Sequence, residues 1–294
     1  MLPNFIGIGA PKAGTTWLFL CLNEHPQIFV AERKETNFFD YQTIEGRISE
    51  YAEQFAGGPG ASAVGEISTR YLTSIRAPER IRSVIPNVRL FVSLRNPIDQ
   101  VYSHYWHLLR QNFHEWGSVK QDISFEEALE KYEDKVMGSA YYYKHLQRWL
   151  QVFDRSQLHI ILYDDIRTAP EEVLKSLFDF LDVDTAFVPP SINQTGQAAR
   201  RGTSPRGPLC GRIHSYLYDK LNRRVYYPLK KAAGLRTAEK IKNTLRVRET
   251  MERVFHREGY PPMKAPTRVA MRQRFDEEIR GVEELTGRSL NNWK

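Results

Sequence analysis

The chain has 294 residues, of which 41% are hydrophobic and 26% charged; it is long enough for one large α/β domain, and this composition excludes a disordered or low-complexity protein. Its two cysteines, Cys21 and Cys210, argue against a disulfide framework or a cysteine metal site. The net charge of +7 is local, because segment 200–248 carries fourteen Lys or Arg against Asp219 and Glu239, which indicates an anionic ligand or partner surface there.

Short apolar runs alternate with longer helical patterns along the first 190 residues. The runs that predict strands are Phe5–Ala10, Ser62–Ile67, Arg89–Arg95 and Leu158–Tyr163, with Ile28–Ala31 a weaker fifth. The patterns that predict helices are about Thr15–Glu24, Pro97–Leu109, Phe125–Tyr132, Ala140–Phe153 and Pro170–Leu181. Strands separated by helices predict an α/β fold, with a parallel sheet of about five strands flanked by helices on both faces.

After Val188-Pro-Pro190 the strand signals stop. A polar Gly/Pro/Arg-rich loop covers 192–208, and the remainder is predicted to be helical at Ile213–Leu221, Ala238–Val254 and Arg268–Leu285. We therefore predict a single domain over 1–294, with an α/β core at 1–190 and a basic loop and helical C-terminal part at 191–294. The apolar run at Phe5–Ala10 is too short for a signal peptide or a membrane span, so we expect a cytoplasmic protein, with a trimmed luminal domain as the alternative.

The stretch from Gly7 to Trp17 is the most informative part of the chain. It reads as a strand, a Pro/Gly turn and a helix that begins with two hydroxyl residues. Backbone N–H groups and the helix dipole at such a junction bind phosphate, and Lys12 adds a full positive charge.

This loop differs from the phosphate loop of nucleoside triphosphatases, in which a lysine directly follows the last glycine. Here Thr15 takes that place, and Lys12 lies two residues before Gly14. Asp164-Asp165, after an apolar strand, imitates the Walker-B end of those proteins. A P-loop kinase or ATPase is therefore the alternative function, and an ordinary turn at the strand end is the other interpretation of the two aspartates.

The sequence Pro11-Lys-Ala-Gly-Thr-Thr-Trp17 resembles the 5′-phosphosulfate loop of sulfotransferases, of both cytosolic and heparan-modifying types. The resemblance runs from Ile6 to about Leu181, continues thinly to Gly202, and returns weakly at Leu285–Trp293. It implies a P-loop-like domain that takes 3′-phosphoadenosine-5′-phosphosulfate (PAPS) as co-substrate. The residues that it implies for the phosphosulfate are Lys12, Ala13, Gly14, Thr15 and Thr16, with Trp17 stacking on adenine as in cytosolic members.

Leu94-Arg-Asn-Pro97 with Ser103 resembles the 3′-phosphate motif of the family. The spacing is physically reasonable, because Arg95 ends a strand, Pro97 starts a helix, and Ser103 lies about two turns along it, so that guanidinium and hydroxyl can share one phosphate. Arg200-Arg-Gly202 resembles the loop that closes over this phosphate in cytosolic members, which implies that Arg200, Arg201 and Gly202 bind the cofactor.

Gly138-Ser-Ala-Tyr-Tyr-Tyr143 resembles the family segment that supplies an adenine-contacting tyrosine. We assign Tyr142 to this contact, with Tyr141 as the alternative. Aromatic residues at helical spacing also serve as core, so packing is the competing interpretation.

Two carboxylates are candidates for the catalytic base. Lys34-Glu-Thr-Asn-Phe-Phe-Asp40 resembles the Glu-x-x-Phe-Phe segment of heparan N- and 3-O-sulfotransferases, whose glutamate is the proposed base; this implies Glu35, unless it only pairs with Lys34 or Arg33. Gly65-Glu-Ile-Ser-Thr69 resembles a second segment, Glu-Lys-Thr-Pro, and implies a catalytic or orienting Glu66. Ile67 replaces the lysine of that segment, which weakens any expectation of heparan-like acceptor contacts.

Sulfuryl transfer is an in-line displacement in which charge develops on the leaving phosphate, and Lys12 with the loop amides suits that charge. We therefore predict no metal requirement. The acceptor class stays open among glycan, lipid, phenol and carrier-tethered metabolite. We expect an anionic partner or a membrane surface at the basic segment and no nucleic acid, although the sequence pI of 9.3 also fits a non-catalytic anion- or nucleic-acid-binding module.

Overall fold

The computed structural model describes residues 1–110, 123–194, 203–207 and 256–294, together with single positions between 210 and 254. Unit 1 consists of residues 1–102, 132–199 and 264–294, and unit 2 consists of residues 103–131 and 200–263. The prediction of one domain over the whole chain stays a prediction. No helix among the described residues has the length and apolar character needed to cross a membrane.

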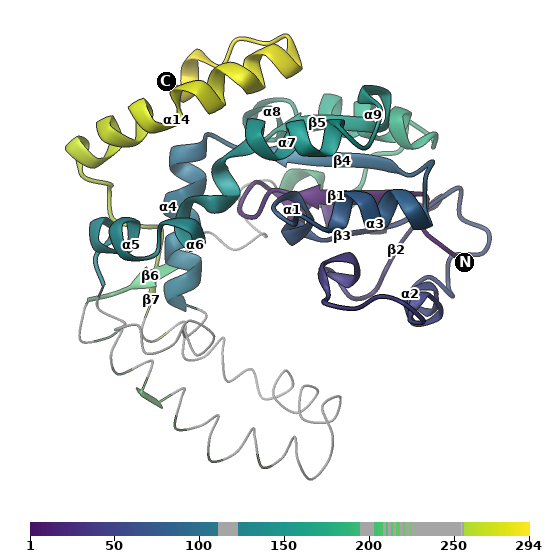
Figure 1. Cartoon of the computed structure of the whole chain (residues 1–294), viewed down its shortest axis with the longest axis horizontal. Helices are drawn as coiled ribbons and strands as arrows, with labels where there is room; N and C mark the ends of the chain where they lie inside the picture. The colour runs from purple at the N-terminus through teal and green to yellow at the C-terminus, as the bar shows by residue number, and fades with distance from the viewer. Residues whose placement is uncertain are drawn as a thin grey trace. The chain divides into compact units, whose positions relative to one another are not determined.

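Unit 1 is built on a five-stranded sheet in which all neighbouring strands are parallel. Its strands are β1 (Phe5–Gly9), β2 (Ile28–Val30), β3 (Ala63–Ile67), β4 (Arg89–Leu94) and β5 (Leu158–Leu162). They lie in the order β2-β3-β1-β4-β5, with β1 in the middle (Figure 1). The predicted five strands and their parallel arrangement are confirmed.

This strand order determines where a ligand is expected. From β1 the chain goes to the edge strand β2, returns to β3 between them, and then crosses to β4 and β5 on the other side of β1. In open parallel sheets, ligands bind outside the carboxyl ends of the strands at the point where the order reverses. Here that point lies between β1 and β4, so the residues that follow Gly9 and Leu94 border it.

Helices cover both faces of the sheet, which explains why the strands are mostly apolar and are buried along most of their length. Trp17 and Leu18 of α1 and Leu177 and Phe178 of α9 share one core with strand residues such as Phe5. Strand residues of the opposite phase, Ile6, Ile8, Leu90 and Val92 among them, are also buried. The helices of unit 1 are α1 (Thr15–Glu24), α2 (Ile48–Glu53), α3 (Ala77–Val84), the first turns of α4 (Pro97–Arg110), α6 (Glu133–Met137), α7 (Tyr142–Leu150), α8 (Tyr163–Thr168), α9 (Pro170–Leu181) and α14 (Ala265–Thr286).

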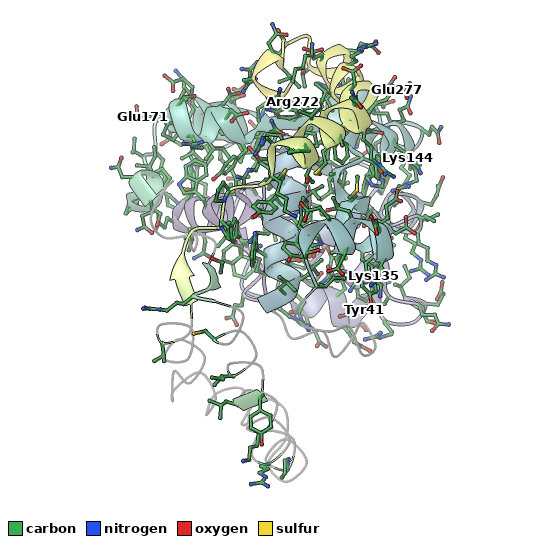
Figure 2. All side chains as sticks on the ribbon, turned by 90° about the vertical axis from the view of Figure 1, so that its left-hand side faces the viewer. Tyr41, Lys135, Lys144, Glu171, Arg272 and Glu277 are labelled. Carbon is green, nitrogen blue, oxygen red and sulfur yellow. The ribbon has the colours of Figure 1, made fainter. Side chains whose placement is uncertain are left out.

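The predicted helix at Arg268–Leu285 is observed as α14, which packs on α7 (Figure 1). Its apolar face buries Met271, Phe275 and Ile279, whereas Arg272 and Glu277 are exposed at the surface (Figure 2). The two helices approach closely at Gly281, where an added Cβ would overlap the ring of Tyr143. Glu278 Oε2 also accepts the backbone N–H groups of Tyr143, at 2.7 Å, and Lys144, so that a carboxylate of α14 caps α7.

Unit 2 contains the rest of α4, helix α5 (Phe125–Lys131) and a two-stranded antiparallel sheet of β6 (Thr203–Pro205) and β7 (His256–Glu258). The sequence did not predict these strands, because three residues are too short to show a periodic pattern. Their pairing is continued by Ser204 Oγ, which donates to the carbonyl of Gly259 at 2.9 Å. Of the predicted helix at 213–221 only positions 213, 216, 217 and 220 are described, and of that at 238–254 only position 254.

Candidate active site

The loop between β1 and α1 is held by hydrogen bonds to its carbonyl oxygens. Ser93 Oγ donates to the carbonyl of Ala13 at 2.5 Å, Gln100 Nε2 to that of Pro11 at 3.0 Å, and Arg95 Nη1 to that of Lys12 at 3.4 Å. These three donors come from β4, its end and α4, so the loop carbonyls are turned toward that side. The N–H groups of the loop therefore do not point toward these three donors.

The turn into α1 depends on Gly14, which has a φ of 86°. A side chain there would have a strained backbone and would meet Tyr163 and Ile166 at about 3 Å. In the described part of the chain, no backbone carbonyl accepts the N–H groups of Gly14, Thr15 or Thr16. Unsatisfied N–H groups and the positive end of the helix dipole make this position suitable for a phosphate group.

Arg95 follows β4 and lies at the same corner of unit 1. Its guanidinium carbon is 5.0 Å from the ring centroid of Tyr163, a cation–π contact, while Nη1 reaches the carbonyl of Lys12. Asn96 Oδ1 accepts the N–H of Ile98 at 3.0 Å and so caps α4. The structure therefore places Arg95 beside the backbone of Lys12, and the roles of both residues stay predictions.

Tyr142 is the first residue of α7 and is 1% exposed. Burial raises the pKa of its hydroxyl, and the neighbouring Arg95 partly offsets this effect. Tyr141, by contrast, accepts a hydrogen bond from Arg274 Nε at 3.0 Å and contacts Phe275, so it belongs to the α14 interface. This difference favours Tyr142 over Tyr141, but the adenine contact stays a prediction.

The other predicted cofactor residues stay predictions as well. Ser103 is buried on α4 in unit 2, with its hydroxyl 3.3 Å from that of Tyr260, whose ring stacks on Trp106. Trp17 is 2% exposed, and its indole N–H donates to the carbonyls of Ser191 and Ile192. Residues 200–202 lie outside the described residues.

Glu66, the penultimate residue of β3, is a fully buried carboxylate that accepts four hydroxyl hydrogen bonds. Its Oε2 accepts from Thr36, at 2.5 Å, and Ser68, at 2.7 Å, and its Oε1 accepts from Tyr51, at 2.7 Å, and Tyr71, at 3.0 Å. Burial, and then the charge of Glu66, raise the pKa of both tyrosines well above the usual value, so both stay protonated and donate. The lone pairs of Glu66 are thus fully used within the protein.

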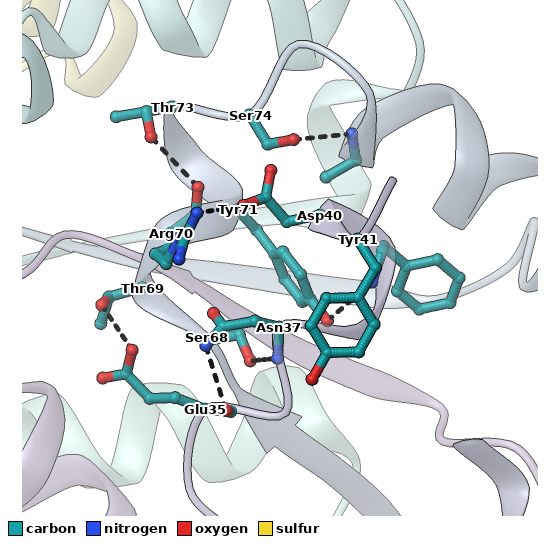
Figure 3. A network of polar contacts seen from close by, with 12 residues as sticks. Glu35, Asn37, Asp40, Tyr41, Ser68, Thr69, Arg70, Tyr71, Thr73 and Ser74 are labelled. Carbon is teal, nitrogen blue, oxygen red and sulfur yellow. Dashed lines mark hydrogen bonds and ion pairs between the residues drawn. The ribbon is translucent and has the colours of Figure 1, made fainter. Parts of the chain in front are cut away.

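Glu35 has the opposite environment, since its side chain is 33% exposed. Lys34 Nζ lies 3.1 Å from Oε1. Thr69 Oγ1 donates to Oε2 at 3.0 Å, as Figure 3 shows. The backbone has a left-handed φ of 68°, and its N–H donates to the carbonyl of Ile67 at 3.0 Å, which places Glu35 beside the end of β3. The ion pair with Lys34 that the sequence suggested is therefore present and leaves part of the carboxylate open to solvent.

The segment that follows Glu35 is fixed at many points. Asn37 N–H donates to Ser68 Oγ at 3.0 Å, and Arg70 pairs with Asp40 at 2.9 Å (Figure 3). Arg80, on α3, donates to the carbonyls of Phe39, Tyr41 and Gln42. The carboxylate of Glu35 is consequently presented by a rigid backbone.

Comparison with known proteins decides the family. The model of the sulfotransferase domain family matches residues 2–195. This chain belongs to the sulfotransferase family. The predicted family, and with it the transferase class, is confirmed.

Several curated sulfotransferases are related to the chain over part of their length. The human bifunctional heparan sulfate N-deacetylase/N-sulfotransferase 2 is 28% identical over 62% of this chain and 22% of its own. Human heparan sulfate glucosamine 3-O-sulfotransferase 5 is 30% identical over 66% of this chain and 56% of its own. The membrane-associated sulfotransferase kil1 of Dictyostelium discoideum is 25% identical over 76% of this chain and 64% of its own. The chain thus spans between about a fifth and two thirds of the length of these relatives.

Solved structures show the same fold. A sulfotransferase from Alicyclobacillus acidocaldarius superposes with a TM-score of 0.69 at 24% identity, covering 100% of this chain and 99% of its own. The sulfotransferase domain from the curacin biosynthetic pathway gives a TM-score of 0.51 at 16% identity, covering 67% of this chain and 79% of its own. The predicted P-loop-like α/β fold is confirmed.

In this sulfotransferase chain, the two aspartates that imitate a Walker-B end are held by the chain itself. Asp164 Oδ2 accepts from the indole N–H of Trp293 at 2.6 Å and from Asn292 Nδ2 at 3.1 Å, and Asp165 forms an ion pair with Arg288. Among the residues that the structure describes, no group of three or more His, Cys, Asp or Glu is arranged to hold a metal ion. These contacts do not favour the kinase or ATPase alternative.

Sequence reasoning missed the residues that support the sulfotransferase site. Ser93 and Gln100 hold the phosphate loop, Thr69 holds Glu35, and Tyr51 and Tyr71 hold Glu66. No local pattern marks them, since each acts on a partner that only the fold brings near. Thr69 is the exception, because it stands where the family segment has a proline and so offers a hydroxyl that proline lacks.

Proposed function

We propose that this chain transfers a sulfuryl group from PAPS to an acceptor hydroxyl or amine. The observation that carries this proposal is the corner where Arg95 and the phosphate loop meet, with the loop carbonyls bound by Ser93, Arg95 and Gln100. A loop held in this way presents N–H donors and Lys12 to one anionic group, while Arg95 offers a second cationic position. A nucleotide with phosphates at both its 5′ and 3′ positions suits these two positions.

In this proposal, the loop amides and Lys12 bind the 5′-phosphosulfate. Arg95, Ser103 and the Arg200-Arg201-Gly202 loop bind the 3′-phosphate, and Tyr142 and Trp17 contact adenine. The resemblance to the family motifs supports each role, and the proximity of Lys12, Arg95 and Tyr142 in unit 1 supports three of them together.

The proposed reaction is a single in-line displacement. The acceptor oxygen or nitrogen attacks sulfur, the bond between sulfur and the bridging phosphate oxygen breaks, and its electron pair stays on adenosine 3′,5′-bisphosphate. Lys12 and the loop N–H groups stabilise the charge that grows on this phosphate. Because these groups can neutralise the leaving phosphate, we expect turnover without added metal.

Glu35 is proposed as the base that takes the acceptor proton. Its carboxylate is partly exposed and is held by Lys34 and Thr69 on a fixed backbone. Glu66 is proposed as an orienting carboxylate, because all four of its hydrogen bonds run to hydroxyl groups of the protein. Burial and hydrogen bonding support this division of roles, as does the resemblance of the Glu35 segment to the family segment; residue spacing alone cannot rank the two.

The acceptor is proposed only as a class of nucleophile: the hydroxyl or amine of a glycan, lipid, phenol or carrier-tethered metabolite. The names of two relatives include heparan sulfate, which supports a glycan, whereas Ile67 in place of the family lysine argues for different contacts. An anionic partner or membrane surface at segment 200–248, a cytoplasmic location and a single domain over 1–294 remain parts of the proposal.

The direct test is transfer of label from ³⁵S-labelled PAPS to a panel of these acceptor classes, with and without EDTA. The expected result is acceptor-dependent transfer that EDTA does not reduce. Transfer to no acceptor, together with Mg²⁺-dependent phosphoryl transfer from labelled ATP, would contradict the proposal.

A further inference from the structure

The last segment of the sequence, Leu290–Lys294, packs into unit 1 through Trp293. Trp293 is 1% exposed, and Leu290 is buried as well. The ring centroids of Trp293 and Tyr142 are 6.5 Å apart. The backbone N–H of Leu290 donates to Glu283 Oε1 at 2.7 Å, which fixes the segment to the end of α14. The roles proposed for the phosphate loop, Glu35 and Glu66 do not explain why this segment is held so firmly.

Trp293 contacts three elements that meet around Arg95. Its carbonyl accepts from Asn96 Nδ2 at 3.3 Å, and Asn96 is the residue directly after Arg95. Its indole N–H donates to Asp164 Oδ2 at 2.6 Å, and Asp164 directly follows Tyr163, the ring beneath the Arg95 guanidinium. Its ring meets Tyr142, which also neighbours Arg95.

Additional contacts make this arrangement stiff. Arg288 pairs with Asp165 through Nη1 and Nη2, and Arg268 Nη2 bonds Asp99 Oδ1, in the first turn of α4, at 2.7 Å. The segment is thus anchored to α8 and α14, and α14 to α4. A movement of Trp293 would shift the neighbours of Arg95 on α4, α7 and α8 together.

We propose that Trp293 is a positioning residue that sets the side-chain geometry of Arg95 for a phosphate at the 3′ position of the nucleotide. This inference rests on the proposed function and deepens it, because it assigns a task to the Asp164-Asp165 pair. In this role, Asp164 holds Trp293 and Asp165 holds Arg288, just before the Leu290–Lys294 segment, and neither binds a metal ion. Selection for the 3′-phosphate then depends on a contact between residues 129 positions apart.

The test compares dissociation constants for adenosine 3′,5′-bisphosphate and adenosine 5′-monophosphate, measured by calorimetry in EDTA. The constant for the monophosphate divided by that for the bisphosphate reports only the contribution of the 3′-phosphate, and a lower ratio means weaker selection for that phosphate. Trp293→Phe keeps a ring but removes the N–H donor, and Asp164→Ala removes the acceptor. Each is expected to lower the ratio roughly three- to tenfold, which is the usual value of one such hydrogen bond, with the affinity for the monophosphate unchanged.

The double variant separates this link from general loss of packing. If the two residues act through one hydrogen bond, the double variant lowers the ratio no more than either single variant, whereas additive losses would overturn the link. Ile279→Ala, on the buried face of α14, is the stability control: it is expected to lower the melting temperature and leave the ratio unchanged. A ratio that followed melting temperature across all variants would reduce Trp293 to a packing role.

Arg95→Ala separates failure of this inference from failure of the proposed function. It is expected to abolish the difference between the two nucleotides. If it does so while the Trp293 and Asp164 variants keep the wild-type ratio, the positioning role is wrong and the donor site stands. If Arg95→Ala itself leaves the ratio unchanged, the proposed 3′-phosphate site is wrong, and the role of Trp293 with it.

Discussion

The phosphate loop, residues 10–14, and the segment that carries Glu35, residues 34–42, are both irregular, but different interactions hold them. Side chains of β4, of Arg95 directly after it and of α4 bind the carbonyls of the phosphate loop. The Glu35 segment is fastened to the end of β3, where one buried carboxylate, Glu66, accepts four hydroxyl groups. Hydrogen bonds from side chains to backbone carbonyls thus organise the first region, and one buried charge organises the second.

The difference shows that, in both regions, the groups that hold the backbone are distinct from the groups proposed to act on the ligand or the acceptor. In the phosphate loop, carbonyls take the structural hydrogen bonds, which leaves the loop amides for an anionic ligand in the proposed function. In the second region, the proposed mechanism gives Glu66 the structural role and Glu35, whose carboxylate is partly exposed, the chemical one. The variants below test this separation, from the largest expected effect to the smallest.

Glu35→Gln keeps the size and hydrogen-bonding capacity of the side chain but cannot accept a proton. Turnover should fall by roughly 10²–10⁴, the usual contribution of a positioned general base, while nucleotide affinity stays near wild type. Single-turnover rates at saturating PAPS measure this, with Glu66→Gln as the comparison. Near-normal turnover in the Glu35 variant beside a collapse in the Glu66 variant would reverse the two roles.

Lys12→Ala should lower kcat by about 10²–10³, because it removes a charge that stabilises the leaving phosphate as its charge grows. Arg95→Ala should mainly raise the KM for PAPS, because the 3′-phosphate does not change during the reaction. Steady-state kinetics on both variants separate the two effects. Equal losses of binding with normal kcat at saturation would remove Lys12 from the leaving-group role.

Glu66→Gln should affect stability, since its new NH₂ group faces hydroxyls that now donate to a carboxylate oxygen. We expect the free energy of unfolding to fall by roughly 2–4 kcal/mol, with buried hydroxyls left unpaired. Urea denaturation measures this, and Glu35→Gln, at a partly exposed site, is the control and should change it by less than about 0.5 kcal/mol. Equal stability of the two variants would mean that Glu66 does not organise the segment.

The sequence predicted the five strands of the parallel sheet well because each is a short, mostly apolar run; the predicted Leu158–Tyr163, for example, is observed as Leu158–Leu162. The phosphate loop was predictable for a similar reason, since its glycine, lysine and hydroxyl residues are adjacent in sequence. The environment of Glu66 was not, because Thr36 and Tyr51 reach it only once the strands pair. The contact between Trp293 and Asp164 lies still further from any local pattern.

Thr69→Val should have the smallest effect, because it keeps the shape of the side chain and removes only the hydroxyl that donates to Glu35. We expect kcat to fall about three- to tenfold, with the KM for PAPS unchanged. Thr69→Ser restores a hydroxyl at the same position and should recover most of the rate. If valine and serine gave the same kcat, Thr69 would not position Glu35.

The central claim is that this site binds a nucleotide with two separate phosphates and does so without a metal. Calorimetric titration of the wild-type chain with adenosine 3′,5′-bisphosphate in EDTA tests it most directly. The account predicts saturable binding that is unchanged by Mg²⁺ and strongly weakened by Arg95→Ala, together with poor binding of ATP–Mg²⁺. Tight, Mg²⁺-dependent binding of ATP with no binding of the bisphosphate would contradict it.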